Sequence, residues 1–316
     1  MEIIELGSYT DEEKLMIAKN HLFPKQLTKH GLKKSQVRVT DDAIREIITC
    51  YTRESGVRSL ERAFGEISRK SALQMLAQET PKRITVTGSN LETFLGVRKF
   101  LPDRLPCTDQ IGLVTGLAWT SVGGETLEVE VNVMDGTGKL ELTGNLGDVM
   151  KESAHAALSY IRANASKLGV SADFYKTKDI HVHFPEGAVP KDGPSAGVTV
   201  CTAIVSALTG VSVRRDVAMT GEISLRGRVM RIGGLKEKTM AALRHGIRTV
   251  IIPRDNERDL EEIDQTVRKS LNFISAQSVE TVLDAALNRT AEMNPAILGD
   301  LPADVKTKAK KLGLRQ

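Results

Sequence analysis

The sequence predicts a multidomain α+β or α/β protein, with a small helical domain over residues 1–100 and a mixed domain over residues 101–293. Apolar residues recur at helical spacing in the first part, whereas the strict alternation typical of strands begins only beyond residue 100. The proline-containing segment 101–106 has the composition of a linker between the two. A length of 316 residues fits two or three domains with a sizeable core. A basic tail over residues 294–316 completes the expected organisation.

Helix-start signals define the first domain. Thr10 and Glu13 are three residues apart, which is the spacing of a capping box. Thr40 precedes a second apolar run with helical period, and a third helix is expected after Val57 and Arg58. Short runs of β-type residues at 37–39 and 84–87 complete a small helical domain.

The second domain alternates strands and helices without a regular βαβ period. Residues 127–133 alternate strictly, and residues 139–142 follow a glycine-rich turn, so we expect these two segments to pair as a hairpin. Beyond the hairpin we expect helices at 149–167 (ending at Gly169), 195–208, 235–245 and 279–287, strands at 180–184 and 249–252, and a strand pair around 221–227.

Composition and charge exclude several classes of protein. A net charge of +4 is too small over this length to indicate a nucleic-acid-binding protein. Cys50, Cys107 and Cys201 have no CxxC spacing and are expected to be reduced thiols, neither disulfides nor metal ligands. No apolar run is long enough for a membrane span, and Glu2 and Glu5 replace the basic start of a signal peptide. We therefore expect a cytoplasmic protein without membrane contact.

Ser195 lies where a loop rich in glycine and proline turns into an apolar helix, a position that exposes a hydroxyl and gathers backbone N–H groups. Lys238 falls on the buried side of its helix together with Leu235 and Ala242. A lysine accepts a proton from serine only when it is neutral, so such a site must lower the lysine pKa from about 10.4. Spacing alone leaves open whether Lys238 meets Ser195 or lies along the protein surface.

Two histidines offer other chemistries. His181 and His183 are two residues apart on a predicted strand and face the same side. With Asp192 and Ser195 they have the residue types of a Ser-His-Asp triad. Alone they would form half of a metal site, for which no third ligand is near in sequence, so no metal is expected.

Four segments carry a family resemblance: residues 181–188 (HVHFPEGA), 190–197 (PKDGPSAG), 220–227 (TGEISLRG) and 233–238 (GGLKEK). In order and spacing they resemble the peptidase domain of the A-type Lon proteases, which are ATP-dependent AAA+ serine proteases. The resemblance extends from about residue 105 to residue 287. Residues 1–100 resemble the small helical (lid) subdomain of the Lon AAA+ module.

The resemblance implies roles for individual residues. Ser195 matches the nucleophile and Lys238 the general base of a Ser-Lys dyad, Thr220 matches the threonine that orients the lysine, and backbone amides around Ser195 match the oxyanion hole. Arg58 matches a sensor arginine that reaches toward the γ-phosphate of ATP. Gly193 belongs to a glycine-rich loop around Ser195 that we expect to rearrange at low cost.

The resemblance also implies a serine endopeptidase that degrades unfolded or misfolded proteins inside a homohexameric ring, as part of protein quality control and the stress response. Peptide hydrolysis would need no cofactor. ATP and Mg²⁺ would bind in another part of the AAA+ module, because this sequence contains no GxxxxGK[ST] phosphate loop. We therefore expect a C-terminal fragment that does not hydrolyse ATP by itself.

The alternative is a non-catalytic binding module with a peptidase-like fold that associates weakly with DNA through its basic tail. The presence of Ser195, Thr220 and Lys238 together argues against it. Trp119, the only tryptophan, is expected in the core, at the substrate side or in a subunit contact.

Overall fold

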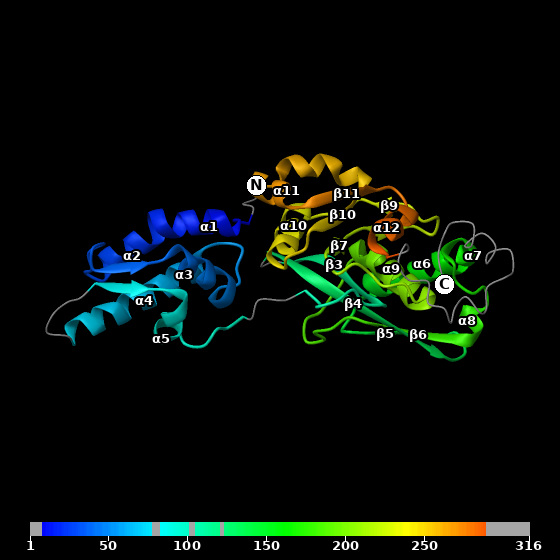
Figure 1. The fold of residues 1–316 in the computed structure, drawn as a ribbon, viewed down its shortest axis with the longest axis horizontal. Coiled ribbons are helices and arrows are strands. Elements are labelled where there is room, and N and C mark those ends of the chain that lie inside the picture. Colours follow the sequence, from blue (N-terminus) through cyan, green and yellow to red (C-terminus); the bar gives the residue numbers. More distant parts are fainter. Residues whose placement is uncertain (1–7, 78–82, 101–104, 121–122, 289–316) are drawn as a thin grey trace, which may run out of the picture. The chain divides into compact units, whose positions relative to one another are not determined.

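The computed structural model describes residues 8–77, 83–100, 105–120 and 123–288, and the chain divides into two compact units (Figure 1). The helical unit comprises Met1–Arg104 with Thr120–Gly123, and the mixed unit comprises Leu105–Trp119 with Gly124–Gln316. The basic tail 294–316 and most of the linker 101–106 lie outside the described residues. The domain boundaries near residues 100 and 293 stay predictions.

Capping at Thr10 and Thr40 starts two helices of the helical unit as the sequence predicts. Thr10 Oγ1 accepts from Glu13 N at 3.1 Å while Glu13 Oε2 accepts from Thr10 N at 2.7 Å, which completes a capping box. Thr40 caps the later helix α3 through its side chain, whose Oγ1 accepts from Ala43 N at 3.3 Å. The apolar faces of the helices enclose a core of their own that includes Phe64 and Ile67. The elements are α1 (Asp11–Ile17), η1 (Ala18–Leu22), α2 (Phe23–Lys29), β1 (Val37–Val39), α3 (Asp41–Glu46), η2 (Ile47–Tyr51), α4 (Arg58–Leu76), β2 (Ile84–Val86), η3 (Gly88–Asn90) and α5 (Leu91–Leu95).

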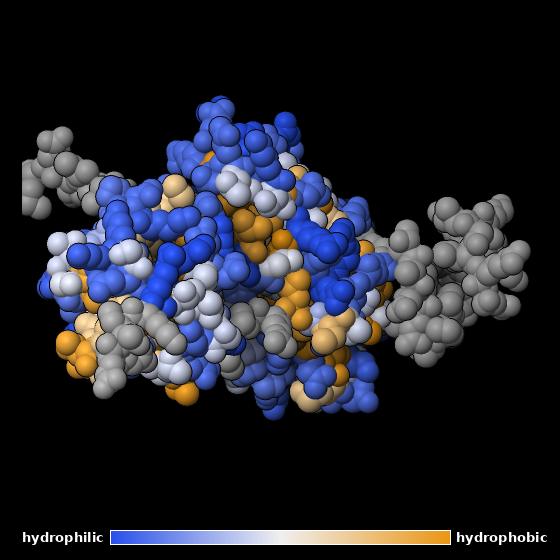
Figure 2. Space-filling model, turned by 60° about the vertical axis from the view of Figure 1, so that its left-hand side comes forward, coloured by the Kyte–Doolittle hydropathy of each residue, from blue (hydrophilic) through white to orange (hydrophobic). Residues whose placement is uncertain are grey.

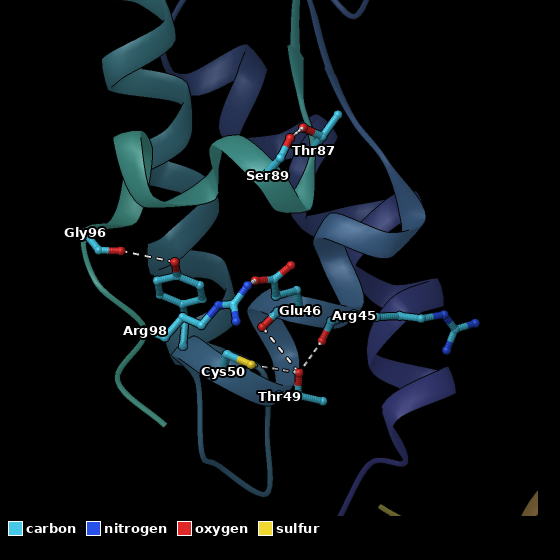
Figure 3. Close-up of polar contacts among 9 residues, drawn as sticks. Arg45, Glu46, Thr49, Cys50, Thr87, Ser89, Gly96 and Arg98 are labelled. Carbon is cyan, nitrogen blue, oxygen red and sulfur yellow. Dashed lines mark hydrogen bonds and ion pairs between the residues drawn. The ribbon is translucent and has the colours of Figure 1, made fainter. Parts of the chain in front are cut away.

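The π-helical segment η2 holds the chain that follows α5 (Figure 3). Tyr51 Oη donates to Gly96 O at 3.1 Å, and Arg98 Nη2 lies 2.6 Å from Oε1 of Glu46, the last residue of the preceding helix α3. The Cys50 carbonyl accepts from the backbone amides of residues 99 and 100. A π-helical turn is rare, and here its last two residues, Cys50 and Tyr51, both bind the returning segment.

A seven-stranded sheet of order β11-β10-β7-β3-β4-β6-β5 forms the centre of the mixed unit. Alternate residues of β7 and β10 enter two different apolar clusters, so the sheet is covered on both faces there. Helices α6, α9 and α12 contribute to one cluster, and α10 and α11 contribute to the other. The strands are β3 (Leu113–Thr120), β4 (Gly123–Asp135), β5 (Leu140–Thr143), β6 (Lys178–His183), β7 (Val217–Met219), β10 (Thr249–Pro253) and β11 (Asn272–Ala276), with β8 (Glu222–Ile223) and β9 (Val229–Met230) as a separate antiparallel pair. The helices are α6 (Asp148–Ala163), α7 (Ala165–Leu168), α8 (Phe174–Thr177), η4 (Pro194–Ala196), α9 (Gly197–Thr209), α10 (Leu235–Arg244), η5 (Arg254–Glu262), α11 (Gln265–Ser270) and α12 (Val279–Ala286).

The predicted hairpin is wrong, although both of its strands exist. Strand β6 lies between β4 and β5, antiparallel to β4 and parallel to β5. Asp179 at the start of β6 explains the insertion, because its Oδ1 accepts from the backbone amides of Thr137, Gly138 and Lys139 at 2.7, 2.9 and 2.8 Å. The turn amides thus bind a carboxylate from a strand about forty residues away in sequence, and the two strands separate around it.

Hydrophilic residues predominate on the face shown in Figure 2, with apolar residues gathered in smaller patches. The large exposed apolar side chains include Leu76, Val97 and Leu225. Within the described ranges, no helix is both long enough and apolar enough to cross a membrane.

Candidate active site

Lys238 lies in the interior of the mixed unit, near the start of α10. Only 2% of the residue is exposed, as the helical register predicts, and its Nζ donates to Thr220 Oγ1 at 3.1 Å. Burial lowers the pKa of the amine from 10.5 to about 8, because removing water disfavours its charged form. A buried amine with this pKa is partly neutral near pH 7 to 8 and therefore able to accept a proton.

Thr220 connects the lysine to the serine loop. It follows β7, is 1% exposed, and its hydroxyl donates to the Ser195 carbonyl at 3.4 Å while accepting from Lys238. The same carbonyl accepts from Gly221 N at 2.9 Å. The structure therefore brings Thr220 and Lys238 into contact and ties both to the main chain of Ser195.

Ser195 itself lies in the 3₁₀ turn η4, directly before α9, and is partly exposed. The α-helix expected to begin at Ser195 begins two residues later, at Gly197. Among the hydrogen bonds of the described residues, none joins Ser195 Oγ to Lys238 Nζ. Two backbone amides near Ser195, where the oxyanion hole is expected, are already engaged. Gly193 N donates to Asp192 Oδ1 at 2.9 Å, and Val198 N donates to Gly221 O at 3.1 Å. The direct hydrogen bond of a Ser-Lys dyad is thus not formed among the described residues, and Thr220 connects Lys238 to the Ser195 carbonyl.

Asp192 anchors the serine loop to α6. Its Oδ1 accepts from Met150 N at 3.1 Å, in the first turn of α6, so a carboxylate from the loop caps that helix. The hydroxyl of Ser153, one turn further along α6, donates to the Pro194 carbonyl at 3.2 Å. Sequence reasoning did not find this anchoring role, because a cap supplied by a distant loop has no local spacing signal.

The two histidines face a different partner. His181 Nε2 and His183 Nδ1 lie 2.9 and 2.7 Å from Thr143 Oγ1, across the β5–β6 pair. Within the described parts of the chain, no hydrogen bond joins either histidine to Asp192 or Ser195. This geometry disfavours the triad. The described residues also hold no group of three or more His, Cys, Asp or Glu side chains arranged for a metal ion.

Sequence reasoning left Trp119 open between the core, the substrate side and a subunit contact, and it missed Gly124 and Arg244. Trp119 is 60% exposed, so it is not a core residue, and it packs against Gly234 at the start of α10. Gly124 on β4 approaches the peptide between Glu237 and Lys238, and Arg244 Nη2 donates to Gly124 O at 2.7 Å.

Arg58 begins α4 in the helical unit and lines a cavity of about 720 Å³ there. Other cationic side chains share this lining, among them Lys29, Arg62, Arg69 and Lys99, and they outnumber its two carboxylates, Glu61 and Glu66. Such a cluster attracts anions. Arg58 belongs to a different unit from Ser195, Thr220 and Lys238.

Comparison with known proteins identifies both parts of the chain. The Lon protease (S16) C-terminal proteolytic domain matches residues 85–289, and the Lon protease AAA+ ATPase lid domain matches residues 28–84. Lon protease 1 of Bacillus subtilis (strain 168) is 57% identical over 287 residues, and the Lon protease of Escherichia coli (strain K12) is 54% identical over 287 residues. Each alignment covers 91% of this chain and 37% of the relative, so the chain spans little more than a third of their length. The chain belongs to the Lon protease family, of which it contains the AAA+ lid domain and the C-terminal proteolytic domain.

Proposed function

We propose that this chain cleaves peptide bonds with Ser195 as the nucleophile and Lys238 as the general base, and that Thr220 orients the lysine. The observation that carries the proposal is the buried Lys238 amine, 3.1 Å from Thr220 Oγ1, with Thr220 in turn bonded to the Ser195 carbonyl. A lysine buried without an ion pair among the described residues is costly for a fold, and a role in proton transfer accounts for its position. The family match supports the same assignment.

In the proposed reaction the Ser195 hydroxyl attacks the carbonyl carbon of the substrate, and its proton passes to neutral Lys238. The lysine then returns this proton to the departing amine as the C–N bond breaks, which leaves an acyl-serine. Water hydrolyses that ester in a second step, again with Lys238 as the base. Attack requires the Ser195 side chain to come within hydrogen-bonding distance of Lys238, so we propose that substrate binding orders the loop into this closed form.

Two side-chain removals test the assignment. The assay is cleavage of a chemically unfolded protein in the absence of ATP, with the fragments followed by gel electrophoresis. Ser195→Ala and Lys238→Ala should each abolish this cleavage, whereas His183→Ala should retain it. Cleavage by the unaltered chain should rise through about pH 8, because the lysine with pKa about 8 must lose its proton before it acts. Equal cleavage by the unaltered chain and Ser195→Ala would refute the proposal.

We also propose that the whole protein acts on unfolded or misfolded proteins in the cytoplasm as a homohexameric ring. Peptide hydrolysis itself would use no cofactor, while ATP and Mg²⁺ would bind the AAA+ module, where Arg58 would approach the γ-phosphate. The AAA+ lid match and the cationic cavity around Arg58 support the nucleotide assignment. The alternative, weak DNA association through the basic tail, rests on the charge of that segment alone.

A further inference from the structure

Gly124 of β4 packs directly on the main chain of the helix that carries Lys238. A Cβ atom at this position would lie 1.9 Å from Glu237 O and 2.9 Å from Lys238 N, which is far closer than a side chain tolerates. Gly124 is not among the glycines with positive φ, so its backbone conformation is open to other residues. Glycine is therefore required here for space, because strand and helix backbones touch.

Arg244 ties the same glycine to the opposite end of the helix. Its side chain leaves the last turn of α10, and its Nη2 donates to Gly124 O at 2.7 Å. The bond is charge-assisted and partly buried, which makes it stronger than an ordinary surface hydrogen bond. Strand β4 is fixed in turn within the central sheet, where it pairs with β6 from Glu130 onward. The helix is thus held against the sheet at both ends.

The contact between β4 and α10 also determines how deeply the amine of Lys238 is buried. The protonated form of Lys238 is more stable in water than in the interior, so each protonation favours movement of α10 toward solvent. Such a movement would hydrate the amine and lengthen its 3.1 Å contact with Thr220. We propose that Gly124 and Arg244 are positioning residues that hold α10 against β4 and keep the Lys238 amine at the depth at which it accepts the serine proton. This inference rests on the proposed Ser-Lys function.

Burial is the cause of the lowered pKa of Lys238. The elements in contact with α10 carry further charges, and these remain in place when Gly124 or Arg244 is replaced. They are Glu125 on β4, Lys236 and Glu237 on α10 itself, the charged side chains of η5 (Arg254, Asp255, Glu257, Arg258, Asp259, Glu261 and Glu262), and Asp264, Arg268 and Lys269 at α11. A change in the apparent pKa of the base in Gly124→Ala would therefore report hydration of the amine.

The test is the pH dependence of kcat for a fluorogenic peptide, measured with the full chain and with Gly124→Ala, Arg244→Met and Arg244→Lys. The first two variants should move the rising limb of kcat about one pH unit upward, which is about tenfold slower turnover at pH 7 with recovery above pH 10. Arg244→Met also removes a positive charge, which by itself would raise the pKa of Lys238, so Gly124→Ala is the decisive variant. Arg244→Lys keeps the charge and one donor, and it should restore most of the activity. Lys178→Ala removes a cation paired with Asp135 at the start of β6, on an element that is not packed against α10 in the described part of the chain, and should leave the profile unchanged.

A loss of stability alone would lower kcat equally at every pH, so an unmoved rising limb in Gly124→Ala overturns the inference while leaving the dyad intact. If Gly124→Ala does not fold, the comparison between Arg244→Met and Arg244→Lys decides: an unmoved limb in both overturns it. If the unaltered chain and Ser195→Ala behave alike, the proposed function fails first and the inference fails with it.

Discussion

Chemistry and stability make opposite demands on Lys238. A neutral amine is needed to accept the serine proton, and burial supplies it by lowering the pKa from 10.5 to about 8. The same burial penalises the protein whenever the amine is charged. Since one pKa unit represents 1.36 kcal/mol, lowering the pKa of Lys238 from 10.5 to about 8 costs the folded state about 3 kcal/mol of stability when the amine is fully protonated.

Replacement of the lysine should reveal this penalty. Below pH 8 the amine is protonated in both states, and the folded state carries the full cost; between pH 8 and 10.5 the unfolded state binds more protons, so the stability of the unaltered chain rises with pH. Lys238→Met should therefore raise the free energy of unfolding of the mixed unit by up to about 3 kcal/mol at pH 7, and the gain should vanish by about pH 10.5. Denaturant unfolding at several pH values measures it. A gain that is the same at every pH would contradict the stated cause.

Among elements, local signals predicted well and long-range pairing did not. The caps at Thr10 and Thr40 and the helical period of α10 depend on residues that are close together in the sequence, so the sequence predicts them. Strand β7 is buried on both faces and has no alternation to detect. The position of β6 depends on Asp179, a contact across about forty residues in sequence.

The candidate site shows the same difference between local sequence signals and long-range contacts. Ser195, Thr220 and Lys238 stand in dense sequence motifs and were named from them. The contact between Gly124 and Arg244 spans 120 residues in sequence. A glycine that is required only because two backbones pack closely has no periodic sequence pattern by which it could be predicted.

Asp192 offers a test at the level of the loop and α6. As a helix cap it should tolerate Asp192→Asn, which keeps an acceptor oxygen, with cleavage within about tenfold of the unaltered chain, whereas Asp192→Ala should lower the free energy of unfolding by about 1 kcal/mol. In a Ser-His-Asp triad the asparagine variant would instead lose about 10,000-fold in turnover. Peptidase assays and denaturant unfolding of both variants separate the two roles, and a loss of that size in Asp192→Asn would restore the triad.

The whole molecule contains separate apolar cores in its two units. Phe64, 0% exposed, lies in the core of the helical unit, and Ile204, also 0% exposed, lies in the main core of the mixed unit. A fold unit with its own core generally unfolds as its own cooperative transition. The helical unit and the mixed unit should therefore melt as two distinguishable events.

Calorimetry with one core substitution in each unit tests this independence. Phe64→Ala should remove about 3–5 kcal/mol from the transition of the helical unit only, and Ile204→Ala about 2–5 kcal/mol from that of the mixed unit only, because each creates a cavity in one core. Peptide cleavage should follow the second transition, since Ser195, Thr220 and Lys238 all belong to the mixed unit. A Phe64→Ala variant that lowers both transitions equally would show instead that the helical unit and the mixed unit unfold as one cooperative body.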